Sequence, residues 1–131
     1  MANYFNKVKQ FLLDLNYDIS YENSEDQVFV INKEESGISN MVLGCADPIL
    51  IMEQQIIDLN AEDKDIYLAL LQQNRKIVHG AFVLDDSGRS VIFRDTLQLE
   101  NLDLNELDGS LNSLSLLLSE YGNQIIAFSK S

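Results

Sequence analysis

The chain has almost none of the residues that form cross-links or bind metals. Its 131 residues include one cysteine, one histidine, one proline and no tryptophan. A single cysteine excludes an intrachain disulfide, and one cysteine with one histidine gives no metal-ligand spacing. No apolar run approaches the ~20 residues that cross a bilayer, and no signal-peptide pattern is visible. We therefore expect a cytoplasmic protein with no metal, no cofactor and no membrane partner.

Positive charge is also scarce. Nine Lys and Arg residues stand against 21 Asp and Glu residues, which gives a formal net charge of −12. Such a field repels nucleic-acid phosphates, so we expect no nucleic-acid partner. A solvated acidic surface explains the excess, and a cationic partner is the alternative. The content of 46% hydrophobic and 23% charged residues is typical of globular proteins, and the length predicts one domain, residues 1–131.

The groups that catalysis needs are not arranged for it. His79 starts a predicted strand, and Ser87 and Ser90 flank a turn without matching a nucleophile motif. Adjacent acids lie in predicted turns or at a helix start, where turn and capping roles explain them. We therefore predict that the protein is not an enzyme. A pocket converging on His79 and carboxylates would revive the enzymatic alternative.

The hydrophobic pattern predicts three helices and five strands. Apolar residues at helical spacing indicate helices at 3–16, from about 61 to 74, and at 104–128. Strands are expected at 27–33, 38–45, 49–57, 80–84 and 90–99. Asn60 is the expected N-cap of the second helix, and Tyr17 to Tyr21 is expected to be a short extended lead-in. The predicted fold class is α+β, an antiparallel sheet with helices in the order α-β-β-β-α-β-β-α.

Four of the predicted strands are apolar at consecutive positions. Neighbouring side chains of a strand point to opposite faces, so such strands need cover on both faces. If the three helices cover one face, a second copy or a foreign polypeptide covers the other. The alternative is that the last helix crosses to cover it. The apolar runs are Val28-Phe29-Val30-Ile31, Ile49-Leu50-Ile51-Met52, Ala81-Phe82-Val83-Leu84 and Val91-Ile92-Phe93.

The last two strands suggest which residues form the uncovered surface. A three-residue turn at 86–88 would place Phe82, Leu84 and Ile92 on one face with Arg94. We expect the face that carries Arg94 to be the outer one. A contiguous apolar patch on a surface marks an interface, so these four residues form the candidate polypeptide-binding patch.

Several stretches of the chain carry a family resemblance, which is best between Ile66 and Leu107. The segment 35–40, Glu-Ser-Gly-Ile-Ser-Asn before an apolar strand, is similar to YbjN-type sequences. The chain as a whole resembles the small acidic type III secretion chaperones of the Tir type and the related YbjN family. The motifs that carry the resemblance are Leu70-Leu71, Asn74, Gly80-Ala81-Phe82, the Asp-Asp-Ser-Gly-Arg turn and Leu102-Asp103-Leu104.

The resemblance implies a bacterial homodimer that binds extended segments of an unknown client protein without ATP. In secretion chaperones the second helix helps to form the dimer, which implies Tyr67, Leu68 and Leu71 as dimer contacts here. The alternative is a small dimeric regulatory or scaffold protein of the YbjN type with no chaperone activity. Its dimer would bury all of the apolar surface.

Overall fold

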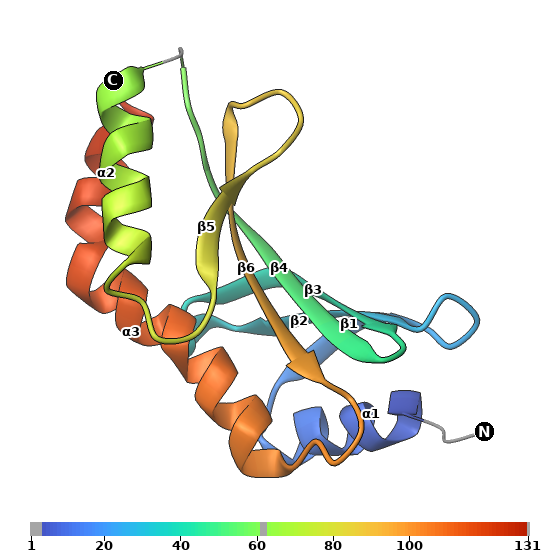
Figure 1. Cartoon of the computed structure of the whole chain (residues 1–131). Helices are drawn as coiled ribbons and strands as arrows, with labels where there is room; N and C mark the ends of the chain where they lie inside the picture. Colours follow the sequence, from blue (N-terminus) through green and yellow to red (C-terminus); the bar gives the residue numbers. More distant parts are fainter. Residues whose placement is uncertain (1–3, 61–62, 131) are drawn as a thin grey trace.

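A computed structural model describes residues 4–60 and 63–130 (Figure 1). Within these residues the chain forms three α-helices, six strands and one short 3-10 turn, and the α+β class is confirmed. The helices are α1 (Tyr4–Asp14), α2 (Lys64–Asn74) and α3 (Leu104–Ser129). The strands are β1 (Asp18–Asn23), β2 (Val28–Lys33), β3 (Ile38–Ala46), β4 (Ile49–Asp58), β5 (Ala81–Leu84) and β6 (Ser90–Gln98), and the 3-10 turn is η1 (Glu34–Ser36).

All six strands form one antiparallel sheet. Their order is β1-β2-β3-β4-β6-β5, which leaves β1 and β5 at the two edges. Short turns join β1, β2, β3 and β4 in chain order, which makes a meander, as expected for antiparallel neighbours. The sheet is strongly twisted, so that β1–β3 run across the direction of β4–β6 (Figure 1).

The prediction of three strands before the second helix was one strand short. The segment expected to be a lead-in is β1, which pairs with β2. A bulge at Ser20 shifts the register, so that Ile19 pairs with Ile31 and Tyr21 pairs with Val30. The bulge therefore sends Ile19 and Tyr21 to opposite faces, and the simple alternation expected of a strand is broken.

The start of α2 also differs from the expectation. Asp63 is the N-cap, and its carboxylate accepts a hydrogen bond from the backbone N–H of Asp65 at 2.9 Å. The predicted cap, Asn60, therefore lies before the true helix start, and Ala61 lies outside the described residues. The start of α3 is as predicted at Leu104, where the Asp103 carboxylate accepts from the Glu106 N–H at 2.7 Å.

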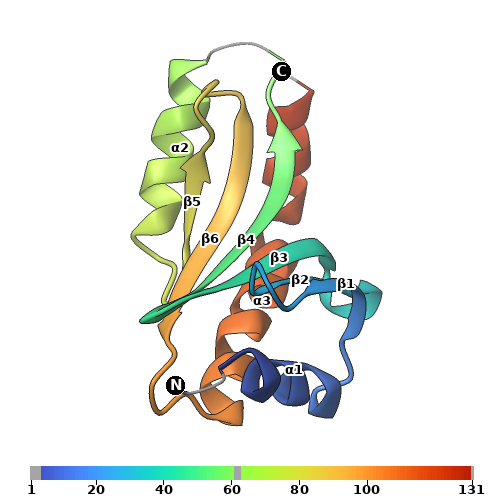
Figure 2. The same ribbon diagram turned by 90° about the vertical axis from the view of Figure 1, so that its right-hand side faces the viewer.

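One face of the sheet carries the core. Phe5 of α1 stacks on Phe29 of β2 with ring centroids 4.2 Å apart. The α3 side chain of Ser110 lies against Met52 and Asp95, which pair across β4 and β6, so α3 packs on this same face. In Figure 2 no described helix crosses in front of β4, β5 or β6. The alternative in which the last helix covers the second face is therefore wrong.

The β5–β6 hairpin has a different register from the predicted one. The Asp85 N–H donates a hydrogen bond to the Ser90 carbonyl at 3.1 Å, which leaves a four-residue loop, 86–89. Phe82 therefore pairs with Phe93, and Val83 pairs with Ile92. One extra loop residue moves every β5 side chain to the face opposite the predicted one, because side chains alternate along a strand.

Candidate functional site

The sheet face away from the helices, called here the open face, is apolar across β1–β3. Opposed residues form a continuous row across all six strands: Tyr21, Val30, Val42, Glu53, Arg94 and Ala81. Tyr21 is 52% exposed and Val42 is 44% exposed, whereas Phe29 and Leu43 on the helix side are fully buried. The consecutively apolar strands thus place one set of side chains in the core and the other set on an uncovered surface.

A second row on the open face runs beside the first. It contains Asn23, Val28, Gly44, Ile51 and Thr96. Gly44 lies between Val28 and Ile51, and a Cβ built on it would meet no atom within 4 Å. The open face therefore lacks a side chain at Gly44, between the β-branched side chains of Val28 and Ile51, and this position is called here the notch.

The charges in the first row balance each other. Arg94 Nη1 donates to Glu53 Oε2 at 3.1 Å across β4 and β6, and both side chains are about two-fifths exposed. An exposed pair of this kind adds ~0–1 kcal/mol to stability. Its main consequence is that the row carries no net charge in a protein of net charge −12.

The second apolar surface lies over α2 and β5. Leu71 is 68% exposed and Leu68 is 52% exposed. Leu71 and Tyr67 line a cavity of about 220 Å³ together with Phe82 and Leu84 of β5. The Tyr67 hydroxyl donates to the Gly88 carbonyl at 2.9 Å and so joins α2 to the β5–β6 loop.

The structure divides the predicted polypeptide-binding patch into two parts. Ile92 and Arg94 lie on the open face, as expected for the outer face, and Thr96 follows them there. The placement of Phe82 and Leu84 beside them was wrong, because the four-residue loop turns both toward the helix side. Phe82 is buried with its ring edge-on to Phe93, at a centroid distance of 6.5 Å and an angle of 85°.

Sequence reasoning missed the β1–β3 half of the open face. The signal for Val30 was present in the apolar run of β2, whose outward positions needed cover. Tyr21 was assigned to a lead-in, and Gly44 was not singled out within the strand that contains it.

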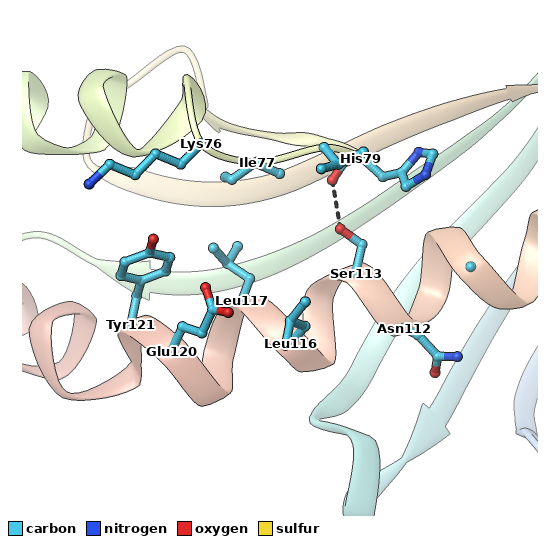
Figure 3. Close-up of a pocket in the computed structure, with 11 residues that line it drawn as sticks. Lys76, Ile77, His79, Asn112, Ser113, Leu116, Leu117, Glu120 and Tyr121 are labelled. Atoms are coloured by element: carbon cyan, nitrogen blue, oxygen red, sulfur yellow. Dashed lines mark hydrogen bonds between the residues drawn. The ribbon is translucent and has the colours of Figure 1, made fainter.

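A third surface is the groove between the α2–β5 connection and α3 (Figure 3). The groove has a volume of about 380 Å³, and both His79 and Glu120 are among its lining residues. The side chains of Leu117 and Tyr121 rise from α3 toward the connection, and Ser113 Oγ donates to the His79 carbonyl at 2.9 Å. The imidazole of His79 points away from Glu120 (Figure 3), so the two do not form an acid–base pair and the groove is suited to an apolar group.

The described part of the chain contains neither a metal-binding cluster nor a membrane-spanning helix. Residues 4–60 and 63–130 hold no group of three or more His, Cys, Asp or Glu side chains placed to bind a metal ion. None of the described helices is long and apolar enough to cross a membrane. Burial raises the pKa of the Cys45 thiol from 9.0 to about 11, which disfavours the reactive thiolate at neutral pH.

Comparison with known families gives a match over the full length. The family model CesT_Tir_1 matches residues 1–131. No curated protein matches the chain.

Solved structures with the same fold include chaperones bound to their partners. The HopA1–SchA chaperone–effector complex matches with a TM-score of 0.64 at 12% identity, over 98% of this chain and 96% of that chain. The Yersinia pestis type III secretion chaperone SycH, in complex with a fragment of YscM2, matches with a TM-score of 0.62 at 14% identity, over 96% and 99% of the two chains. YbjN from E. coli matches with a TM-score of 0.69 at 13% identity, over 91% of each chain. At these identities the likeness establishes the fold, which is that of the type III secretion chaperones.

Proposed function

This chain belongs to the CesT_Tir_1 family, and from that premise we propose that it is a cytoplasmic, chaperone-like homodimer. It acts as one domain over residues 1–131 and holds extended segments of a client protein without catalysing a reaction. The family and the fold are those of non-enzymatic chaperones, and two of the similar structures are chaperones in complex with a protein partner.

The observation that carries the proposal is the open face. It presents Tyr21 and Val42 to solvent beside the half-buried Val30, although the helices have already packed against the other face. Burying a large apolar side chain contributes about 1.5–3 kcal/mol. A contiguous patch of such residues marks an interaction surface, and an extended polypeptide fits a sheet face.

The homodimer is assigned to the surface over α2 and β5. Leu68 and Leu71 are the exposed apolar residues of α2, and Tyr67 holds α2 against the hairpin. A second copy that fills the cavity beside Leu71 would bury these side chains. This arrangement leaves the β1–β3 part of the open face free for a client.

Two measurements on the same protein test the proposal, namely its oligomeric mass and the polypeptides that co-purify with it. Light scattering should give the mass of a dimer, and Leu71→Asp should give a monomer with an unchanged circular dichroism spectrum. Leu13→Asp, at an α1 position that is 48% exposed, is the matched control and should remain dimeric. Tagged protein purified from its native cell should carry a stoichiometric polypeptide partner. A native protein that is monomeric and co-purifies with no polypeptide would contradict the proposal.

A second candidate is a dimeric regulatory or scaffold protein, favoured by the likeness to YbjN. In that case the dimer would bury the open face as well. Val42→Lys would then convert the dimer to a monomer, whereas in a chaperone-like protein it would leave the dimer intact.

A further inference from the structure

We infer that the client docks over the notch at Gly44, and that the docked segment is extended, apolar and flanked by lysine or arginine. This inference rests on the proposed function and specifies where the client lies and what its chemistry is.

The fold does not need a glycine at position 44. A glycine inside a strand weakens it, and it is found at bulges or where another chain comes close to the backbone. The register of β3 with both neighbours is regular at Gly44, so no bulge explains it. A side chain built there would meet no atom within 4 Å, so no internal contact explains it either. The remaining reason is close approach by another molecule.

The surface around the notch is formed by aliphatic side chains. Val28 and Ile51 are its cross-strand neighbours, and Val42 lies two residues away on the same face of β3. These three side chains are β-branched, with stiff rotamers that lose little freedom when covered. Such a surface suits the alternating side chains of an extended segment laid across it.

One end of the open face is negatively charged. The pairing of Val28 with Gly44 and the hydrogen bond from Cys45 N to Gln27 O at 2.9 Å set the β1–β2 turn beside the end of β3. The two turns at this end carry Glu25, Asp26 and Asp47. Neither ion pair of residues 4–60 and 63–130 involves these acids, since the pairs are Lys9–Glu22 and Arg94–Glu53. Basic residues flanking the apolar segment would complement them.

The same charges disfavour a second copy as the occupant of the notch. The cation in the row beside it, Arg94, already pairs with Glu53 within the chain. Each copy has a net charge of −12, so a second copy facing this end would be repelled by the acidic residues there. A client with lysine or arginine does the opposite, and long-range attraction would also speed its arrival.

The experiment compares two labelled peptides about ten residues long, the length of a long strand. Both have the same core of alternating valine and serine, and they are flanked by lysines or by glutamates. Fluorescence anisotropy should show binding of the lysine-flanked peptide, at least about tenfold tighter than the glutamate-flanked one. Gly44→Leu should weaken the lysine-flanked peptide by at least about tenfold, which is about 1.4 kcal/mol, without lowering the melting temperature. Salt at about 1 M should remove most of the preference between the peptides.

Matched variants decide the location of the site. Gly122→Leu adds the same side chain to a helix position that also has open space, and it should leave binding within about twofold. Val42→Lys should weaken the lysine-flanked peptide, whereas Leu13→Lys on α1 should not. Equal binding by Gly44→Leu and the native protein would overturn the inference, and so would equal binding of the two peptides.

The outcomes separate this inference from the proposed function. If a client co-purifies but neither peptide binds, the inference fails and the proposed function stands. If Gly44→Leu instead converts the dimer to a monomer in light scattering, a second copy occupies the notch and the inference fails. If no client co-purifies and neither peptide binds, both fail together.

Discussion

The side-chain amide of Asn74 satisfies both backbone groups of Phe82. Asn74 Nδ2 donates to the Phe82 carbonyl at 3.1 Å, and Asn74 Oδ1 accepts from the Phe82 N–H at 2.7 Å. Phe82 lies on β5, an edge strand, so these are groups that another strand could otherwise pair with. The last residue of α2 therefore closes the centre of one sheet edge.

Asn74→Ala is expected to destabilise the fold and to open this edge. The part-buried N–H and C=O of Phe82 would lose both partners, at a cost of about 1–3 kcal/mol. Urea unfolding measures the cost, and light scattering measures any new self-association. Asn112→Ala removes an exposed hydrogen bond to Asp108 and is the control, with an expected change within about 0.5 kcal/mol. An Asn74→Ala protein as stable and as monodisperse as the native one would contradict this role.

Three glycines are expected to respond differently to alanine. Gly80 has φ +84°, and a Cβ there would collide with the Phe93 ring and lie 3.0 Å from the Arg94 carbonyl, so Gly80→Ala should cost about 2–5 kcal/mol. Gly88 has φ +75° but open space, so Gly88→Ala should cost about 1–2 kcal/mol from backbone strain alone. Gly44→Ala should be neutral or stabilising by about 0.5–1 kcal/mol. Chemical denaturation of the three variants would contradict this account if Gly44→Ala proved the most harmful.

Ser110→Ala is expected to loosen α3 from the sheet. Ser110 is buried, and its hydroxyl donates a short hydrogen bond to the Asp95 carboxylate on β6. Its removal leaves a part-buried carboxylate without this donor, which should cost about 1–3 kcal/mol. Ser113 is on the same helix, and Ser113→Ala removes only an exposed hydrogen bond to the His79 carbonyl of the α2–β5 connection, so it should cost less. Equal unfolding free energies for the two variants would show that the hydrogen bond from Ser110 to Asp95 stabilises the fold no more than the exposed one from Ser113.

Alkaline pH is expected to destabilise the protein through two partly buried groups, the Tyr17 phenol and the Cys45 thiol. Burial is the largest cause that raises the pKa of Tyr17 from 10.0 to about 12, and burial raises that of Cys45 from 9.0 to about 11. Above pH 9 the unfolded chain loses these protons first, so the free energy of unfolding should fall as pH rises from about 9 to about 12. A Tyr17→Phe, Cys45→Ala double variant should show a shallower fall when both proteins are unfolded in urea at a series of pH values. An identical slope in both proteins would exclude these groups as the cause.

Local signals in the chain were enough to predict the main elements. Leu104 to Phe128 repeats at helical spacing and forms α3, and the apolar runs form β2, β4, β5 and β6. These predictions succeed because helical spacing of apolar residues marks the buried side of a helix, and a short continuous apolar run marks a strand. Two local details could not be predicted, namely the Ser20 bulge in β1 and the choice of Asp63 over Asn60 as the cap of α2. Both depend on hydrogen bonds that compete closely along the same short segment.

Only half of the candidate site could be predicted from the sequence. Ile92 and Arg94 were correctly expected on the outer face, because Arg94 and Thr96 follow each other at strand spacing. Phe82 and Leu84 were misplaced, because a loop of three or four residues fits the same turn sequence and the choice reverses every side chain of β5. The pairing of Asp85 with Ser90 decides it, and that contact exists only in the folded hairpin.

The amino-acid sequence by itself determined that apolar side chains lie on both faces of the sheet, since neighbouring residues of a strand point to opposite faces. It also determined the absence of a disulfide and the strong negative charge. The tertiary structure alone decided which face the helices cover, because packing of α1 and α3 depends on contacts between residues far apart in the chain. It also brought Tyr21, Val30 and Val42 into one row and placed Gly44 beside them, since register between strands is set only when the strands pair.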